Sequence, residues 1–397
     1  MDRVTLSDRG HASARPPAGL RRLCVFLADL HGGGAERVMV RLAAGIAARG
    51  VSLDLVLARA VGPYLDEVPE TVRVVDLDAR RVALAVRPFV AYLRRKRPDM
   101  VFTTLPHASL AAAIARSWAA VPTLLVLREA TTPSRRRVAT LDIKTRAVHL
   151  AMRAAYAAAD GVVAVSEGVA DDLRRTWGVP DRKLWTLYSP LVTPDVAEKA
   201  AAEPDHPWMS DAAVPVVLGV GALQPYKGFC TLLEAFARVR ASRAVRLVVL
   251  GEGPQRPELE AHARALGIAD HVAFPGFRVN PFAYMARSAV FVLASEREGL
   301  PGALVQAMAC GCPVVATDCP SGPAEVLEDG RYGTLVGMGD ADAMADGVIH
   351  ALDEPADSDA LRSRAARFAS DRVIDDHLET FGRAVRAAAT TPEEGTP

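Results

Sequence analysis

Residues 289–318, AVFVLASEREGLPGALVQAMACGCPVVATD, combine two strands and a helix in thirty positions. The apolar run at the start predicts a buried strand, the Pro-Gly pair at 301–302 predicts a helix start, and CGCP predicts the helix end before VVATD. Strand, helix and buried strand in this order are typical of a parallel sheet. Glu298 is therefore expected at the carboxyl end of a strand, and Gln306 one or two turns inside the helix.

The same alternation continues through both halves of the chain. Apolar runs separated by Ala- and Leu-rich helical stretches occur at LCVFLADL, LDLVLA, VRVVDL, DMVFTT, TLLVLRE and GVVAVS, and later at VVLGVG, VRLVVLG, VAFPGF, AVFVLAS and PVVATD. This pattern predicts an α/β protein of two doubly wound, Rossmann-like domains that face a central cleft. Ligands of such sheets bind at the carboxyl ends of the strands, so loops that follow strands are the expected site.

The length of 397 residues fits two domains better than one. We expect flexible tails at 1–20 and 389–397, a first domain at 21–191, a polar linker at 192–213 and a second domain at 214–370. The amphipathic segment at 371–388 predicts a final helix, which either closes the second domain or returns to complete the first.

Composition narrows the class of protein. No run of about 18 uncharged apolar residues occurs, and the first residues lack a signal-peptide core. The five cysteines form an odd set without zinc-ligand spacing, so we expect buried thiols in a reducing, cytoplasmic setting. The first 190 residues carry an excess of 11 positive charges and the remainder the same excess of negative charges, which predicts lobes with different partners.

Two strand-to-helix loops carry groups suited to an anion. LCVFLADLHGGGAERVMV places Gly33 and Gly34 at a helix start, where backbone amides can approach a phosphate or a polar sugar edge. The spacing is neither GxGxxG nor that of a P-loop, and a tight turn is the alternative. VVLGVGALQPYKGF delivers Lys227 in a comparable place, as a diphosphate counter-charge or a solvated lysine. Ser321 and Gly322 follow another strand end.

The ordered series GGGAER, AVSEGVADDL, VGALQPYKGFCTLLEAFA, LGEGPQRPELEAHARALGI and SEREGLPGALVQ resembles the family 4 (group 1) retaining glycosyltransferases of the GT-B fold, over about residues 21–386. The resemblance implies transfer of a sugar from a nucleotide-diphosphate sugar, UDP first and GDP second, to a hydroxyl of a glycan or lipid-linked acceptor. It also implies a place in polysaccharide, lipopolysaccharide or glycolipid biosynthesis, and catalysis without a metal or other cofactor.

On the donor side, the resemblance assigns roles residue by residue. Glu298 matches the first of two glutamates eight positions apart, beside the donor sugar, and Lys227 matches a diphosphate-binding lysine. Gln306 stands where the second glutamate would hold the ribose, and Ala222 stands where members carry a diphosphate-binding arginine. The further expected donor-binding residues, the last two of them possible substitutes for the missing arginine, are Gly33, Gly34, Gly299, Leu300, Pro301, Arg278 and Arg297.

On the acceptor side, the resemblance points to His107, Arg128 and Glu129, while Ser189 replaces a common asparagine. The catalytic set is expected to be Glu298, Lys227 and His107. We expect front-face attack, in which the departing phosphate takes the acceptor proton. The amides of the glycine loop and around Leu300, together with Lys227, would stabilise the phosphate charge.

Two basic clusters, at 92–99 (YLRRKRPD) and 131–156, lie in the first half. They predict peripheral contact with anionic lipid at the inner face of the plasma membrane, with a solvated helix face as the alternative. Nucleic acid is not expected, because no aromatic residues interleave the basic runs. Two other functions stay open: a nucleotide-sugar epimerase, and a degenerate sugar-nucleotide-binding subunit suggested by Ala222 and Gln306.

Overall fold

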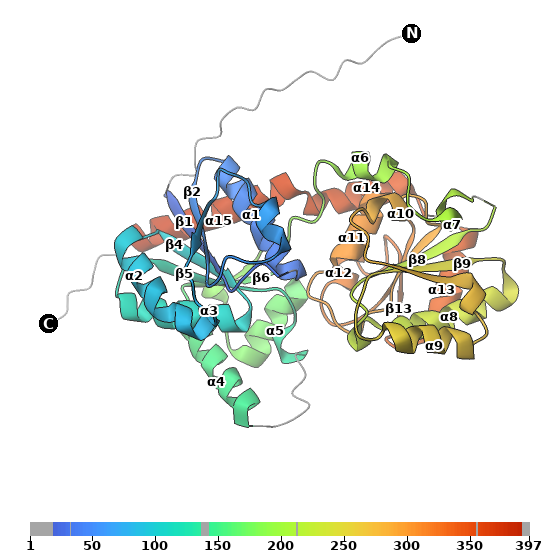
Figure 1. Ribbon diagram of the computed structural model, residues 1–397, viewed down its shortest axis with the longest axis horizontal. Helices are drawn as coiled ribbons and strands as arrows, with labels where there is room; N and C mark the ends of the chain where they lie inside the picture. The colour runs from blue at the N-terminus through green and yellow to red at the C-terminus, as the bar shows by residue number, and fades with distance from the viewer. Residues whose placement is uncertain (1–18, 32, 136–142, 212, 355, 391–397) are drawn as a thin grey trace, which may run out of the picture. The chain divides into compact units, whose positions relative to one another are not determined.

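The computed structural model describes residues 19–31, 33–135, 143–211, 213–354 and 356–390 (Figure 1). The described residues form two compact units, one within 1–126 together with 374–397 and the other within 127–373. Most of both predicted tails lies outside the described residues, as does the centre of the second basic cluster at 136–142. Leu20, expected in the first tail, is buried, and the last helix continues to Thr390, one residue beyond the expected tail start.

The first sheet has seven strands in the order β3-β2-β1-β4-β5-β6-β7, and the division between the units falls inside β5. The recorded strand pairs are parallel. All six predicted strands are present, whereas β7 was not predicted. The bounds are β1 Arg22–Leu27, β2 Ser52–Leu57, β3 Arg73–Asp76, β4 Met100–Thr104, β5 Leu124–Glu129, β6 Gly161–Ala164 and β7 Leu184–Thr186.

Aromatic packing holds helices to the first unit. Phe26 of β1 stacks on Phe89 with 4.3 Å between ring centroids, and Phe102 of β4 meets Phe381 of the last helix edge-on at 5.1 Å. From Ile374 onward, the last helix therefore belongs to the first unit. The helices are α1 Gly34–Ala48, α2 Val86–Lys96, α3 Pro106–Ala119 and α15 Ser370–Thr390.

The second sheet has six strands in the order β10-β9-β8-β11-β12-β13, all paired in parallel. The five predicted strands are present, and β13 was not predicted. The bounds are β8 Val216–Val220, β9 Arg246–Leu250, β10 Val272–Gly276, β11 Val290–Leu293, β12 Val314–Thr317 and β13 Thr334–Val336.

Alternating side chains of this sheet fill two separate cores. Val217 and Val249 contribute to one core with α8, α9 and α13, while Leu218 and Val248 contribute to the other with α10, α11 and α14 (Figure 1). Helices therefore cover both faces, as the apolar runs predict for a parallel sheet. The α-helices of the second unit are α4 Ile143–Ala158, α5 Glu167–Trp177, α6 Val196–Ala201, α7 Pro207–Ser210, α8 Phe229–Ser242, α9 Arg256–Ala265, α10 Phe282–Met285, α11 Gly302–Ala309, α12 Pro323–Leu327, α13 Ala341–Asp353 and α14 Ser358–Ala365.

The predicted linker, 192–213, is not an open connection. It contains α6 and α7, and Val196 and Met209 lie in the core that also contains α11. These apolar side chains explain the difference, because they gain burial that a solvated linker could not offer. The residues after β5 also contact loops of the second sheet, so the units do not divide at the predicted boundary of 191. The domain boundaries stay predictions.

Candidate active site

Both sheets reverse their strand order between two central neighbours. In the second sheet the reversal lies between β8 and β11, and in the first between β1 and β4. Loops that leave the carboxyl ends of such neighbours diverge to opposite faces and leave a crevice for ligand. Lys227 follows β8 and Glu298 follows β11, so the second unit brings these two predicted residues to one switch point.

Lys227 and Glu298 form a partly buried ion pair. The Lys227 ammonium lies 2.6 Å from Oε1 of Glu298, with 21% and 12% of the two side chains exposed. The Ser295 hydroxyl donates to the same oxygen at 2.8 Å. Burial lowers the pKa of Lys227, but the charge and hydrogen bond of Glu298 more than offset this and leave it raised. Lys227 is therefore a cation whose charge is balanced inside the site.

The loops that carry this pair are bound to one another. The Glu296 amide donates to the Tyr226 carbonyl at 2.8 Å. Gly228 has a φ of +67° and caps α8, and a Cβ there would lie 1.9 Å from the Ala294 carbonyl oxygen. Only glycine accommodates both the backbone angle and this approach. The turn at 225–228 thus holds Lys227 against the end of β11.

The two candidate substitutes for the missing arginine differ in setting. The Arg297 guanidinium lies over the Tyr226 ring, 4.4 Å from its centroid, and the Lys227 ammonium lies 5.6 Å from the same centroid. Arg278 instead donates to the carbonyls of Pro275 and Phe277. Contacts therefore bring Arg297 beside Lys227, whereas those recorded for Arg278 hold it at the end of β10.

Helix α11 follows the Glu298 loop as predicted. It begins at Gly302 after the N-cap residue Pro301 and ends at Ala309. Gln306 lies in its second turn, where the side-chain amide approaches the Leu191 carbonyl at 3.5 Å. Gly299 is buried and Leu300 half-buried between Glu298 and the helix start. The donor role expected of these residues stays a prediction.

Arg128 and Glu129 lie inside the protein. They are 2% and 0% exposed at the end of β5. Arg128 donates to the Ser189 hydroxyl at 2.7 Å, and Tyr156 donates to Glu129 at 2.6 Å. Burial lowers the pKa of Arg128 to about 10. These contacts give both residues a structural setting that the sequence did not indicate, and their acceptor role stays a prediction.

In the first unit, the glycine loop and His107 follow the neighbouring strands β1 and β4. Gly33 is the N-cap residue of α1 and Gly34 its first residue, both exposed. His107 is exposed in the first turn of α3. The Glu36 carboxylate occupies the space where a Cβ on Gly33 would lie, so a carboxylate already sits at the helix start proposed for an anion.

Several site residues escaped the sequence analysis. Ser295 binds Glu298, Tyr226 carries Arg297, and Thr132 and Ser166 contact the backbone after β11. Ser295 was detectable from its place in SEREG, whereas Thr132 and Ser166 have no sequence signal that pairs them with residues more than 130 positions away. Among the described residues, no group of three His, Cys, Asp or Glu is placed to hold a metal, and no described helix is long and apolar enough to cross a membrane.

Comparisons with known proteins agree with this architecture. A family model described as Glycosyltransferase Family 4 matches residues 32–193, and one described as Glycosyl transferases group 1 matches residues 214–354. The chain therefore belongs to the family 4 (group 1) glycosyltransferases, and its two Rossmann-like sheets form the GT-B fold. It is a glycosyltransferase.

Individual relatives extend over most of the chain. The N-acetylgalactosamine-N,N'-diacetylbacillosaminyl-diphospho-undecaprenol 4-alpha-N-acetylgalactosaminyltransferase of Campylobacter jejuni is 28% identical, over 91% of this chain and 99% of its own length. The lipopolysaccharide core biosynthesis glycosyltransferase LpsE of Rhizobium meliloti is also 28% identical, over 86% and 91%. The structure of Anabaena Alr3699/HepE in complex with UDP aligns with a TM-score of 0.72 at 21% identity, over 91% and 99%.

Proposed function

We propose that this glycosyltransferase moves a sugar from a nucleotide-diphosphate sugar to a hydroxyl of a lipid-linked or glycan acceptor, with retention of anomeric configuration. The acceptor class follows the names of the two relatives, one of which acts on a diphospho-undecaprenol and the other in lipopolysaccharide core biosynthesis. UDP is the first nucleotide to consider, because a protein of similar fold binds it. GDP is the second.

The observation that carries the proposal is the Lys227–Glu298 pair at the switch point of the second sheet. A carboxylate is an acceptor for sugar hydroxyls, and an ammonium is a counter-charge for phosphate. The two therefore suit the two ends of a sugar–diphosphate bond. In the free protein they neutralise each other, so donor binding exchanges this contact for contacts with the donor.

The reaction proposed is a front-face displacement. The acceptor hydroxyl attacks the anomeric carbon on the side from which the phosphate departs, and a phosphate oxygen takes the hydroxyl proton. The glycosidic bond forms as the carbon–phosphate oxygen bond breaks, and the nucleoside diphosphate leaves. Lys227 and the amides around Leu300 stabilise the negative charge on the departing oxygen. His107 and the Gly33–Gly34 amides are proposed to act from the first unit.

Arg297 is proposed as the second cation of the diphosphate site. With Lys227 paired to Glu298, those two residues contribute no net charge, and the exposed Ala222 contributes none. The Tyr226 ring lies against the Arg297 guanidinium and places it beside Lys227. A planar guanidinium can bind two phosphate oxygens at once. Arg278 is less suited, because its contacts with the Pro275 and Phe277 carbonyls hold it at the end of β10, whereas Arg297 and Lys227 share the Tyr226 ring.

Contact with an anionic membrane is proposed for the first unit. Trp118 and Ile114 lie four residues apart on α3 and are 57% and 43% exposed. The last turn of α2 is basic, and its Arg94 donates to the Trp118 carbonyl at 2.7 Å. A basic helix end next to exposed apolar side chains suits a lipid surface. Weaker binding of Trp118→Ala to vesicles with phosphatidylglycerol would support this contact.

A thermal-shift panel of UDP, GDP, ADP and CMP, with the matching sugar nucleotides, tests the proposed function. A ligand at a hundred times its dissociation constant stabilises a protein by about 2.7 kcal/mol. We expect selective stabilisation by one nucleoside diphosphate, followed by transfer from its sugars to a polyprenyl-diphosphate acceptor. Absence of any shift would overturn the proposal. Donor binding without transfer on a broad acceptor panel would favour a non-catalytic sugar-nucleotide-binding subunit.

A further inference from the structure

The start of α5 touches the loop that carries Glu298. Ser166, fully buried, is the N-cap residue of α5 and accepts from the Val169 amide at 3.3 Å. Its hydroxyl also donates to the Gly299 carbonyl at 2.7 Å. One hydroxyl has one proton and two lone pairs, so it can make both contacts at once. The helix cap and the hold on the Glu298 loop therefore depend on the same side chain.

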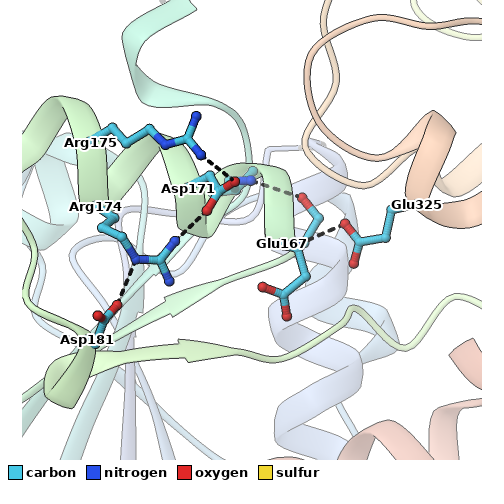
Figure 2. Close-up of polar contacts among 8 residues, drawn as sticks. Glu167, Asp171, Arg174, Arg175, Asp181 and Glu325 are labelled. Carbon is cyan, nitrogen blue, oxygen red and sulfur yellow. Dashed lines mark hydrogen bonds and ion pairs between the residues drawn. The ribbon is translucent and has the colours of Figure 1, made fainter.

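A second contact comes from α12, the short helix that follows β12. Oε2 of Glu325, in α12, accepts from the Glu167 amide at 2.9 Å, and Oε1 accepts from the Tyr188 hydroxyl at 2.8 Å. Figure 2 shows Glu325 reaching the backbone at the start of α5. The first amides of a helix lack partners within it, and an anion is favoured there. Glu325 thus supplies a cap that joins α5 to the second sheet.

A third contact is made to the carbonyl of Glu298 itself, one residue before the Gly299 carbonyl that Ser166 holds. The Thr132 hydroxyl donates to the Glu298 carbonyl at 3.1 Å and lies 2.8 Å from the Ser321 hydroxyl. The backbones around these bonds are tightly packed. A Cβ on Gly299 would lie 2.1 Å from the Ala130 carbonyl oxygen, and a Cβ on Gly168 would lie 2.9 Å from Ser321. The loop has little freedom to shift on this side.

We propose that Ser166 and Thr132 are positioning residues for the transfer reaction, acting through Glu298, and that Glu325 supports Ser166 by holding the start of α5. Thr132 holds the Glu298 carbonyl and Ser166 holds the next one, that of Gly299. Together they fix the main chain from which the Glu298 side chain projects. That side chain must meet Lys227 and Ser295 at 2.6 and 2.8 Å. This inference rests on the proposed function and adds to it three residues outside the donor loops of β8 and β11.

Ser166→Ala and the isosteric Thr132→Val test the inference. Each removes a hydroxyl that holds the loop, and we expect kcat to fall by about tenfold or more, since a misplacement of about 1 Å can cost about a hundredfold. Thr132→Ser keeps the hydroxyl and should restore activity. Asp171→Asn is the matched control, because Asp171 lies on α5 and pairs with Arg174 and Arg175 without a recorded contact to the Glu298 loop (Figure 2).

A double-mutant cycle separates positioning from stability. Calorimetry with UDP, UDP-glucose and UDP-N-acetylgalactosamine measures how much the sugar changes the dissociation constant, without a need for turnover. The quantity compared is the ratio of the dissociation constant for UDP to that for each UDP-sugar. If Ser166 acts through Glu298, Ser166→Ala will change this ratio much less when Glu298→Gln is already present. Equal effects in both backgrounds, or a Thr132→Val protein with unchanged kcat, would overturn the inference. An unmutated protein that neither binds these probes nor transfers sugar would instead overturn the proposed function.

Discussion

The Lys227 ammonium lies 2.6 Å from Oε1 of Glu298, the same oxygen that accepts from the Ser295 hydroxyl. The residues stand 71 positions apart and meet because β8 and β11 are neighbours in the sheet. In the proposed function, a donor diphosphate that binds Lys227 has to displace Glu298 from it. Under these proposed roles, the pair would connect recognition of the sugar to recognition of the phosphate, since a ligand that engages one partner would release the other.

Glu298→Gln should separate binding from transfer. The amide cannot neutralise Lys227, so UDP affinity should stay equal or rise. Loss of the charged contact to the donor sugar should lower kcat by roughly a hundredfold, in the range seen when one preorganised polar contact is removed from a transition state. Titration calorimetry with UDP and a steady-state transfer assay measure the two effects. If the variant turned over as fast as the unmutated protein, Glu298 would have no part in the transfer reaction.

Arg297→Ala should weaken UDP binding far more than uridine binding. A charge-assisted bond to phosphate contributes about 1.5–3 kcal/mol, which corresponds to a factor of ten to a hundred in the dissociation constant. Arg278→Ala, whose arginine is held by carbonyls, is the matched control and should leave UDP affinity unchanged. Ala222→Arg in the Arg297→Ala background should restore affinity by placing a cation on the neighbouring loop. If Arg278→Ala weakened UDP binding more than Arg297→Ala did, Arg278 would be the second cation of the diphosphate site.

Much of this arrangement could be predicted from the sequence. The strands of both sheets were recognisable as short apolar runs, because side chains on both faces of a parallel strand are buried. Pro301 and Gly302 marked the start of α11, and the loop positions of Lys227 and Glu298 followed from the strand ends. β7 and β13 were missed because each has only three residues, too few for a periodic signal.

Contacts between distant segments could not be predicted in the same way. The resemblance assigns Arg128 to the acceptor side, a role that stays a prediction, but no local pattern indicated its bond to Ser189, 61 positions later. The Thr132, Ser166 and Glu325 contacts depend on tertiary packing for which local pattern has no signature. Local sequence reports which face of an element is buried, whereas partner identity requires the assembled fold.

Gln306→Glu should strengthen donor binding. A carboxylate at this position in α11 can form charge-assisted bonds with the ribose diol, which an amide cannot, and the gain expected is about 1–2 kcal/mol, or roughly tenfold in the dissociation constant. UDP should gain this affinity, while 2′,3′-dideoxy-UDP should not, because it lacks the diol. Calorimetry with both nucleotides measures the difference. Equal changes for the two would show that residue 306 does not contact the ribose.

Gly228→Ala should disrupt the turn that carries Lys227. Gly228 and Gly267 have nearly the same φ, +67° and +69°, but a Cβ on Gly228 would lie 1.9 Å from the Ala294 carbonyl oxygen, whereas nothing lies within 4 Å of one on Gly267. Gly267→Ala should therefore cost only the left-handed backbone term, about 1–2 kcal/mol of unfolding free energy. Gly228→Ala adds an overpacking cost of about 1–3 kcal/mol.

Urea unfolding of the two glycine variants measures these costs, and UDP titration tells whether the donor site is affected. Because the Gly228 turn holds Lys227 against the end of β11, Gly228→Ala should also bind UDP more weakly. This loss should be seen without urea, at a temperature where the variant is fully folded. Gly267→Ala should keep it. Equal stabilities and equal UDP affinities for the two variants would mean that the turn adjusts without moving Lys227. The close packing of Ala294 against Gly228 would then not set the geometry of the ion pair.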